Sequence, residues 1–401
     1  MVLVLVGLIA VVAAAVLLLR PSGSPDRGPA TLPPVGTWSE APGLTTIRGT
    51  TTAVVLDDGK VLSVGGGVGA IALAATETYD PTADTWKEVA RPGQARRGHQ
   101  AVVLDDGRVL VAGGLAEGSP LASAELYDPA TDTWAPTAPM ATPRLGHSLT
   151  LLADGRVLVA GGSALESTEA AGGGQTIRTE ASTEIFDPAT GSWASAGSMA
   201  SPRFEHSATL LADGRVLIVG GLGPVGEGGE IGPLSSTEIY DPAANAFVTS
   251  TDLAEGRANH AATLLSGDSV LVSGGAGGEN GDISLASAEV FDTRAATWTT
   301  VAPLQSPRTG HTATRLADGR VLVAGGESVQ RGSRRSLTSS EVFEAGDGVK
   351  GAWRSAGNMA CPRSEQAAVL LGDGSVLVVA GDAAFPGQAP MAQSCVGRYR
   401  P

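Results

Sequence analysis

The sequence predicts an all-β fold in which seven similar units, each of four short strands, close into a ring. One sequence pattern recurs along the chain at intervals of about 50 residues, which is the length of a propeller blade. The 55 glycines and 24 prolines are typical of short strands joined by tight turns. With 42% hydrophobic residues, the chain is also too apolar to be disordered.

The unit from Arg144 to Trp193 shows the four expected strands in order. Apolar runs lie on both sides of Asp154-Gly155, and Asp-Gly between two such runs favours a hairpin because the turn needs positive φ. The second strand ends at Gly161-Gly162, where glycine lets another backbone approach closely. Pro188 stops the third strand, since proline cannot donate to the ladder, and Trp193 begins the fourth.

Seven such units follow one another, and the first element of the chain completes the last of them. Each unit begins at an arginine, namely Arg48, Arg97, Arg144, Arg203, Arg257, Arg308 and Arg363. The seventh unit has no fourth strand after Tyr399, whereas Thr37-Trp38 matches the Thr-Trp that begins this strand elsewhere. We expect the strand near Trp38 to complete the seventh blade in a 3+1 arrangement, which removes the exposed edge of an open ring.

This pattern resembles the Kelch repeat, and over residues 36–401 it is similar to bacterial members of the galactose-oxidase-like propeller group. The resemblance implies a seven-bladed Kelch-like β-propeller, a fold that serves mostly as a binding platform and in some members as an enzyme. Oxidase chemistry of that group needs copper held by tyrosine and histidine, with a Tyr–Cys cofactor. All tyrosines and histidines of this chain occupy repeat positions, so we predict no cofactor and no metal site.

An apolar segment precedes the repeats. Residues Val2 to Leu19 carry no charge and approach the roughly 20 residues that cross a bilayer. We expect residues 1–20 to form a hydrophobic helix that serves as a signal anchor or transmembrane helix, with a cleaved signal peptide as the alternative. Residues 21–35, rich in Pro, Gly and Ser, are expected to form a linker to the propeller at 36–401.

The N-terminal segment predicts where the propeller resides. It would be membrane-anchored and extracytoplasmic, or secreted if the segment is cleaved. Arg20 and Arg27 follow the segment and no basic residue precedes it, which favours the opposite orientation. We give this less weight because large domains translocate despite a weak charge bias.

Charge and motifs exclude several functions. A net charge of −14 and the lack of a basic run with interleaved aromatic residues argue against nucleic-acid binding. No phosphate-binding loop, nucleophile elbow or H-E-x-x-H motif is present. Glu279 to Asp282 is rich in oxygen ligands but lacks the EF-hand spacing, so no calcium site is predicted.

The repeat itself explains most residues that carry chemistry. Each histidine follows the unit's arginine, and each tryptophan begins a fourth strand, so we interpret both sets as structural: His99, His147, His206, His260 and His311, and Trp38, Trp86, Trp134, Trp193, Trp298 and Trp353. The arginines are expected to pair with the repeat glutamates Glu77, Glu125, Glu184, Glu238, Glu289 and Glu341. A ring of guanidinium groups around an anionic ligand is the alternative.

Binding residues are expected where the units differ. In the seventh unit Gly397 replaces the glutamate, so Arg363 is hypothesised to be free to meet a ligand. The long, variable loops between second and third strands are the expected binding face, and Arg331, Arg334 and Arg335 make one of them basic. Solvated loops without a ligand are the alternative.

The predicted function is a non-catalytic binding or interaction module for an unknown protein, peptide or glycan ligand. The alternative is a sugar-directed hydrolase or isomerase that uses carboxylates from the funnel or from loops, among them Glu166, Glu169, Glu227 and Glu230. Cys361 and Cys395 both belong to the seventh unit and are expected on one face. They form either a disulfide, as an extracytoplasmic protein permits, or two free buried thiols.

Overall fold

The computed structural model describes residues 35–401 except 168–174, 227, 266–267, 331 and 347–350. The described residues form one compact unit. The expected N-terminal helix, and the linker up to residue 34, lie outside the described residues. Within the described part every regular element is a β-strand, and no helix there is long and apolar enough to cross a membrane.

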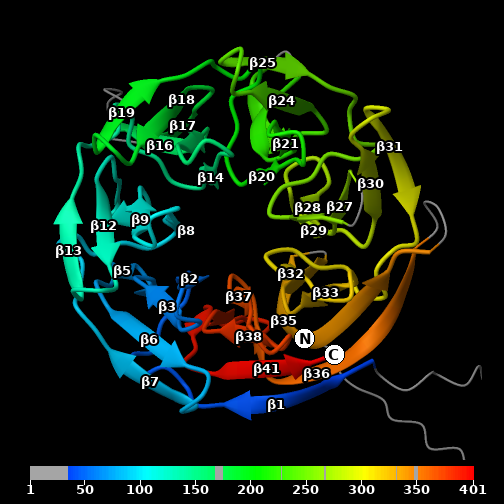
Figure 1. Cartoon of the computed structure of the whole chain (residues 1–401). Coiled ribbons are helices and arrows are strands. Elements are labelled where there is room, and N and C mark those ends of the chain that lie inside the picture. Colours follow the sequence, from blue (N-terminus) through cyan, green and yellow to red (C-terminus); the bar gives the residue numbers. More distant parts are fainter. Residues whose placement is uncertain (1–34, 168–174, 227, 266–267, 331, 347–350) are drawn as a thin grey trace, which may run out of the picture. The chain divides into compact units, whose positions relative to one another are not determined.

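The strands form seven antiparallel blades around a central axis (Figure 1). From the axis outward, the first four blades are β2 (Thr52–Val55), β3 (Val61–Val64), β6 (Thr76–Asp80) and β7 (Thr85–Glu88); β8 (Gln100–Val103), β9 (Val109–Ala112), β12 (Ala124–Asp128) and β13 (Thr133–Pro136); β14 (Ser148–Leu151), β15 (Val157–Ala160), β18 (Thr183–Asp187) and β19 (Ser192–Ser195); and β20 (Ser207–Leu210), β21 (Val216–Val219), β24 (Thr237–Asp241) and β25 (Ala246–Thr249). The last three are β26 (Ala261–Leu264), β27 (Ser269–Ser273), β30 (Ala288–Asp292) and β31 (Thr297–Val301); β32 (Thr312–Arg315), β33 (Val321–Ala324), β35 (Ser333–Glu344) and β36 (Ala352–Arg363); and β37 (Ala367–Leu370), β38 (Val376–Val379), β41 (Val396–Arg400) and β1 (Thr37–Ala41).

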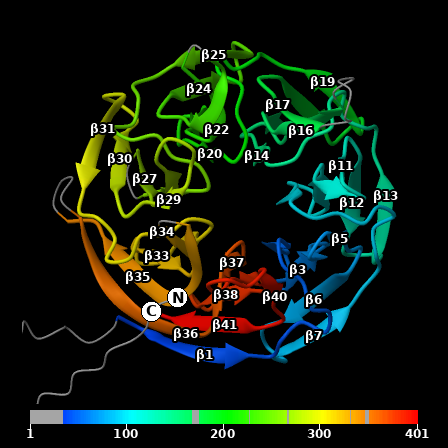
Figure 2. The same cartoon turned by 180° about the vertical axis from the view of Figure 1, so that it is seen from behind.

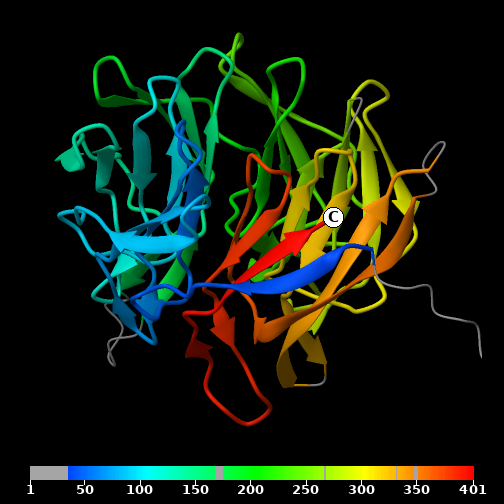
Figure 3. The ribbon, with the colours of Figure 1, turned by 60° about the horizontal axis from the view of Figure 1, so that its bottom comes forward.

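The seventh blade confirms the predicted 3+1 closure. β1 pairs with β41, with Trp38 opposite Tyr399, and Figure 3 shows the two strands side by side. The rings of these two residues lie 5.3 Å apart, and Trp38 Nε1 donates a hydrogen bond of 2.8 Å to Ser340 Oγ in the sixth blade. The N-terminal strand therefore joins the last blade to its neighbour and leaves no open sheet at that point.

A short ribbon connects the second and third strands of every blade. The ribbons are β4 (Gly67–Val68) with β5 (Ile71–Ala72), β10 (Leu115–Ala116) with β11 (Ser119–Pro120), β16 (Ser163–Ser167) with β17 (Gln175–Thr179), β22 (Leu222–Val225) with β23 (Glu230–Pro233), β28 (Ala276–Gly277) with β29 (Ile283–Ser284), β34 (Glu327–Gln330) with the start of β35, and β39 (Asp382–Ala383) with β40 (Met391–Ala392). Because strands alternate in direction, the ribbons and the entries to the first strands share one face, which we call the ribbon face. Figure 2 labels several of the ribbons.

The core lies between successive blades. Second strands such as β15 are buried at every position because both of their faces meet a neighbouring blade, which agrees with their unbroken apolar runs. One cluster joins Leu158 of the third blade with Val216 and Tyr240 of the fourth. Six further clusters repeat this packing around the ring.

Aromatic pairs hold the outer strands in place. In every blade the tryptophan of the fourth strand, or Phe247 in the fourth blade, packs on a Tyr or Phe of the third strand at 4.9 to 5.3 Å between ring centroids. Four of these tryptophans also donate Nε1–H to a backbone carbonyl of the segment between blades, as Trp134 does to Ala90 at 2.8 Å. The six tryptophans thus lie in the scaffold, where the repeat placed them.

The double glycine is required where adjacent blades meet. Gly113 and Gly114 have φ values of 64° and 93°, which side chains rarely adopt. A Cβ atom on Gly113 would overlap the His147 ring and the Arg144 carbonyl of the next blade. The glycine pattern therefore encodes the close contact between blades.

Candidate functional site

Six buried arginines form ion pairs with the repeat glutamates, as expected for a structural role. Arg203 is fully buried, and its Nη2 lies 2.8 Å from Glu238 Oε1. Its Nη1 donates to the carbonyls of Gly220 and Ser236 at 2.7 and 3.0 Å. Burial lowers the pKa of Arg203, and Glu238 opposes that shift. The other pairs are Arg48–Glu77, Arg96–Glu125, Arg144–Glu184, Arg257–Glu289 and Arg308–Glu341, at 2.8 to 3.1 Å.

The arginine of the second blade is Arg96, and the assignment of Arg97 to this position was wrong. Arg96 is buried and pairs with Glu125 at 2.9 Å. It precedes His99 by three residues, the spacing found in the other units. Arg97 is half-buried and lines a cavity at the centre of the ring. The extra arginine is therefore available to the site.

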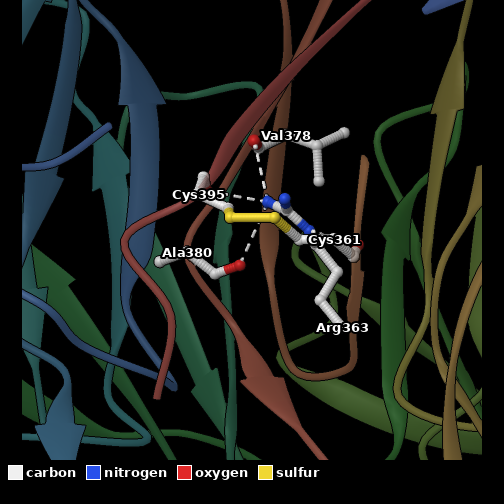
Figure 4. The surroundings of a disulfide bond; sticks show 5 residues. All are labelled: Cys361, Arg363, Val378, Ala380 and Cys395. Atoms are coloured by element: carbon white, nitrogen blue, oxygen red, sulfur yellow. Dashed lines mark hydrogen bonds between the residues drawn. A yellow bond between two sulfur atoms is a disulfide. The ribbon is translucent and has the colours of Figure 1, made fainter. Parts of the chain in front are cut away.

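Arg363 is held inside the wall of the seventh blade (Figure 4). It is 1% exposed, and its Nη1 donates to the carbonyls of Val378, Ala380 and Cys395 at 3.3, 3.3 and 2.8 Å. Burial lowers its pKa to about 10. Gly397 does leave Arg363 without a carboxylate, but backbone carbonyls take its place. Arg363 lines none of the central cavities, so this placement does not support its hypothesised contact with a ligand.

A disulfide joins Cys361 and Cys395 beside Arg363. The two positions correspond to Ser201 and Ser236 of the fourth blade. There, the Ser201 N–H donates to Glu238 and Ser236 Oγ accepts from Arg203, so the ion pair connects the two positions. In the seventh blade a covalent bond connects them instead.

The histidines connect neighbouring blades. His206 Nε2 lies 2.9 Å from Ser148 Oγ of the preceding blade, and His99, His260 and His311 have similar hydroxyl partners at 2.8 to 3.3 Å. Burial and the adjacent arginine lower the pKa of His99 to about 3, and burial lowers the pKa of the other four in the same way. Neutral imidazoles fit the structural interpretation.

The fifth histidine, His147, differs because its preceding blade supplies Gln100 in place of a hydroxyl. The backbone carbonyls of Ala112 and Arg144 lie near its ring, but neither ring nitrogen makes a well-formed hydrogen bond within the described part of the chain. His147 is 2% exposed, and both it and Gln100 line the central cavity. An incompletely bonded polar side chain therefore borders that cavity.

One backbone position per blade surrounds the central channel. It is the second residue after the repeat arginine, and we call the set the axial ring: Thr50, Gly98, Gly146, Glu205, Asn259, Gly310 and Glu365. All seven have positive φ. The N–H groups of Glu205, Asn259, Gly310 and Glu365 each donate to the carbonyl of the preceding ring member at 2.7 to 3.0 Å, and Gly98 donates to Thr50 at 3.4 Å.

Two glutamates occupy this ring where glycine fits best. Glu205 and Glu365 have φ values of 54° and 53°, a conformation that costs a side-chain-bearing residue on the order of 1 kcal/mol or more. Three blades use glycine at the same position, so the fold does not require a carboxylate. Strain that the scaffold does not need is typical of a functional site.

The carboxylates gather in connected cavities on the axis. A cavity of about 390 Å³ is lined by Glu205 and Glu365 together with Arg97 and Gln100. A second, of about 360 Å³ and nearer the ribbons, is lined by the same glutamates and by Glu327, Asp382 and Arg334. These volumes lie within the range of ligand pockets. We call Glu205, Glu327, Glu365 and Asp382 the acidic funnel.

Glu365 is the most perturbed member of the acidic funnel. Its side chain is exposed to the channel, and residues of several blades line the cavity around it. Desolvation by this surrounding protein, and then repulsion by Glu205, Asp382 and Glu327, raises its pKa to about 7. No hydrogen bond or ion pair to its carboxylate is found in the described part of the chain. The site thus contains a carboxylate that faces the channel and has no polar partner among the described residues.

The other three acids are partly compensated. Glu205 Oε2 accepts a hydrogen bond of 2.8 Å from Asn259 Nδ2, while burial raises its pKa. Burial also raises the pKa of Glu327, and Arg334 opposes the shift with Nε at 3.5 Å from Glu327 Oε1. The pKa of Asp382 is raised by burial and lowered by Arg97. The raised pKa values of these carboxyl groups show that the site disfavours negative charge, chiefly because the protein desolvates it.

Of the binding residues predicted from the sequence, only Arg334 lines one of these cavities among the described residues. Arg334 reaches the acidic funnel, Arg335 is exposed on the same ribbon, and Arg331 lies outside the described residues. Of the loop acids, Glu169 and Glu227 are also outside them, and Glu230 is exposed. Glu205, Asn259 and Glu365 were missed. The available signal was a charged or amide residue in place of the glycine of the R-x-G-H motif, at a position that needs positive φ.

Replacing Glu365 with glutamine is expected to stabilise the protein at pH 8 but not at pH 4. A carboxyl whose pKa rises from 4.5 to about 7 on folding contributes stability that is complete below about pH 4.5 and lost as the pH rises through 7. Solvent in the channel screens the group, so the effect should be on the order of 1 kcal/mol. Melting temperatures of both proteins from pH 4 to 8 measure it, and parallel profiles would contradict it.

Comparisons with known proteins agree with this architecture. A family model of the Kelch motif matches residues 96–141. One similar solved structure is a novel fungal alcohol oxidase with catalytic diversity among the AA5 family, in complex with copper, with a TM-score of 0.70 and 17% identity over 92% of this chain and 76% of that chain. Another is YjhT, with a TM-score of 0.56 and 14% identity over 78% and 99% of the two chains. No curated protein matches the sequence. At such identities the likenesses show the fold alone.

Proposed function

We propose that this chain, which is a Kelch-repeat β-propeller, is a binding module displayed outside the cytoplasm that recognises a peptide, protein or glycan on its ribbon face. One observation carries the proposal. The four residues that replace glycine at the axial ring, Thr50, Glu205, Asn259 and Glu365, all line the inner cavity, and the last three also line the outer one. Ribbons of different lengths surround those cavities, and variable loops on a rigid scaffold are where binding normally resides.

Copper oxidation is not part of the proposal, because the residues present do not fit a copper site. All four tyrosines pack against the aromatic residue of the fourth strand. The five histidines lie in five different blades, and both cysteines belong to the disulfide. Among the described residues, no three of His, Cys, Asp and Glu are grouped in a way that could hold a metal ion.

The disulfide supports the extracytoplasmic part of the proposal. Disulfides persist in oxidising compartments and are rare in the cytosol, and this chain has no other cysteine. The apolar segment near the N-terminus supports export in the same direction. Protease accessibility of the propeller in intact cells and in spheroplasts tests it, and protection in both would contradict it.

Ligand capture by matched variants tests the binding function. The full-length protein is screened on glycan and peptide arrays beside the double variant Glu205→Gly/Glu365→Gly, which restores the residue that three blades already use and relieves backbone strain. Asp213→Asn, in an exposed hairpin on the opposite face, is the control. We expect the glycine variant to lose signal on the captured ligand by about 10-fold or more, as for a removed contact residue, and the control to keep it. Equal signals from all three proteins would place the site elsewhere.

A carbohydrate-active enzyme is the second candidate, because Glu205 and Glu365 combine raised pKa values with a shared cavity. A carboxyl with a pKa near 7 is suited to general acid catalysis. Turnover of aryl glycosides that is abolished by Glu365→Gln would favour this candidate over a binding module. Absence of turnover together with ligand capture would favour the module.

A further inference from the structure

We propose that the acidic funnel receives a basic side chain, a lysine ammonium or an arginine guanidinium, presented by a peptide segment of a partner protein with apolar residues beside the basic one. This inference rests on the proposed binding function and specifies its ligand. Three properties of this face lead to it: the charge of the cavities, the unpaired carboxylate of Glu365, and the exposed apolar side chains on the ribbons.

The charge of the site selects a cation. Four carboxyl groups, of Glu205, Glu327, Glu365 and Asp382, line the cavities. The guanidinium groups that line them are those of Arg97 and Arg334, and these already act on Asp382 and Glu327. The bordering histidines are neutral because their pKa values are strongly lowered. An anion would add to the repulsion among the carboxylates, whereas a cation would relieve it.

The two axial glutamates are positioned to hold that cation. Asn259 donates to one oxygen of Glu205, which leaves its second oxygen available. Glu365 lies three positions after Glu205 in the same backbone ring, and its carboxylate has no partner among the described residues. A partly desolvated carboxylate without a polar partner is unfavourable, and a bound ammonium or guanidinium would supply the missing hydrogen bonds and charge.

Exposed apolar side chains on the ribbon face favour a peptide over a sugar. Val68, Ile71 and Met391, on ribbons of the first and seventh blades, are 45%, 68% and 51% exposed, and β4 packs beside β40. Ile283 of the fifth blade is 39% exposed and lines the outer cavity with the acids. Exposed apolar groups beside a charged cavity are typical of protein-binding surfaces. A neutral sugar would satisfy neither feature.

Titration of a model peptide tests the inference. Full-length protein is mixed with a fluorescein-labelled Leu-Leu-Lys-Leu-Leu peptide, and anisotropy is followed at pH 8. The matched peptide contains norleucine in place of lysine, and so keeps the apolar stem and removes the charge. We expect the norleucine peptide to bind about 10-fold or more weakly, as for loss of a close charge pair at an interface. Glu365→Gln is expected to weaken the lysine peptide to a similar degree, and Asp213→Asn to leave it unchanged.

The pH dependence of lysine-peptide affinity distinguishes a binding role of Glu365 from a purely structural one. Glu365 faces Glu205, Glu327, Asp382 and Arg334, and protonating it removes the charge that the cation needs. Lysine-peptide affinity should therefore fall by about 10-fold or more from pH 8 to pH 5.5 in the wild type and much less in Glu365→Gln. A cooperative melting transition of the variant at pH 5.5, at or above the wild-type temperature, establishes that it is folded.

Several results would overturn the inference. Equal affinity for the lysine and norleucine peptides would show that the site does not read charge. Binding of an amino sugar such as glucosamine without binding of the peptide would show that the cation comes from a glycan. If array ligands are captured at the axial ring but none is basic, the binding function stands and only the ligand assignment fails. If the glycine double variant captures array ligands like the wild type, the proposed function itself fails.

Discussion

Glu238→Ala is expected to lower the free energy of unfolding by about 3 to 5 kcal/mol, the largest loss among the single substitutions considered. Removing one partner of a buried ion pair leaves an uncompensated charge, and here Arg203 is fully buried. The loss also removes the acceptor of the Ala200 and Ser201 N–H groups. Chemical denaturation of the wild type and the variant measures the difference.

Two control variants separate charge from packing. The double variant Arg203→Met/Glu238→Leu removes both charges and should lose much less stability than Glu238→Ala, because apolar replacements of a buried pair are often neutral. Arg363→Met should cost less than Arg203→Met, because the seventh blade has Gly397 and no carboxylate is left unpaired. A loss below about 1 kcal/mol for Glu238→Ala, the size expected of an exposed ion pair, would contradict the structural role of these pairs.

Replacing both cysteines with serine is expected to lower the free energy of unfolding by about 2 to 4 kcal/mol. The disulfide joins residues separated by 34 positions, so it restricts the unfolded chain. It also connects two positions that an Arg–Glu pair connects in the other blades. The Cys361→Ser/Cys395→Ser variant and the reduced wild type should melt at similar temperatures, both below the oxidised wild type. A variant as stable as the oxidised protein would show that β1 alone closes the ring.

The fold could be predicted from the sequence because its signals are local and repeated. Asp-Gly turns, double glycines and tryptophans each specify a structure within a few residues. Where one unit lacks a signal, the same position in the other units still indicates the structure. The Thr-Trp pair at residues 37–38 was sufficient to predict the closing strand, since only the strand that begins with this pair was missing from the seventh unit. The misplaced arginine of the second blade arose because Arg96 and Arg97 are adjacent and only their spacing from His99 distinguishes them.

The site was harder to predict because it forms only when all blades meet. Glu205 and Glu365 lie in different blades, far apart in the sequence, and each resembles an ordinary variation of its own unit. Arg363 shows the converse difficulty. The sequence showed that the seventh unit has no glutamate to pair with Arg363. It did not indicate that Arg363 would be buried and would donate to three backbone carbonyls instead. Departures from the repeat identify function only after the structure shows which of them face the channel.

The axial ring connects stability with function. Glycine at Gly98, Gly146 and Gly310 satisfies the positive φ of the ring without strain, whereas Glu205 and Glu365 add strain and mutual repulsion. Functional sites commonly reduce stability in this way. Glu365→Gln is expected to stabilise the protein at pH 8 and to weaken peptide binding. Both results together would show that Glu365 lowers stability and supports binding.

The pKa of Glu365, measured with and without the lysine peptide, tests the central claim most directly. Full-length protein labelled with [5-¹³C]glutamate is titrated by NMR, and the Glu365→Gln variant assigns the signal. We predict a pKa of about 7 in the free protein and a decrease of about 1 unit or more with saturating peptide, because a nearby cation favours the ionised carboxylate. A free pKa near the ordinary 4.5, or a pKa that saturating peptide does not change, would contradict the assignment of the acidic funnel as a cation-binding site.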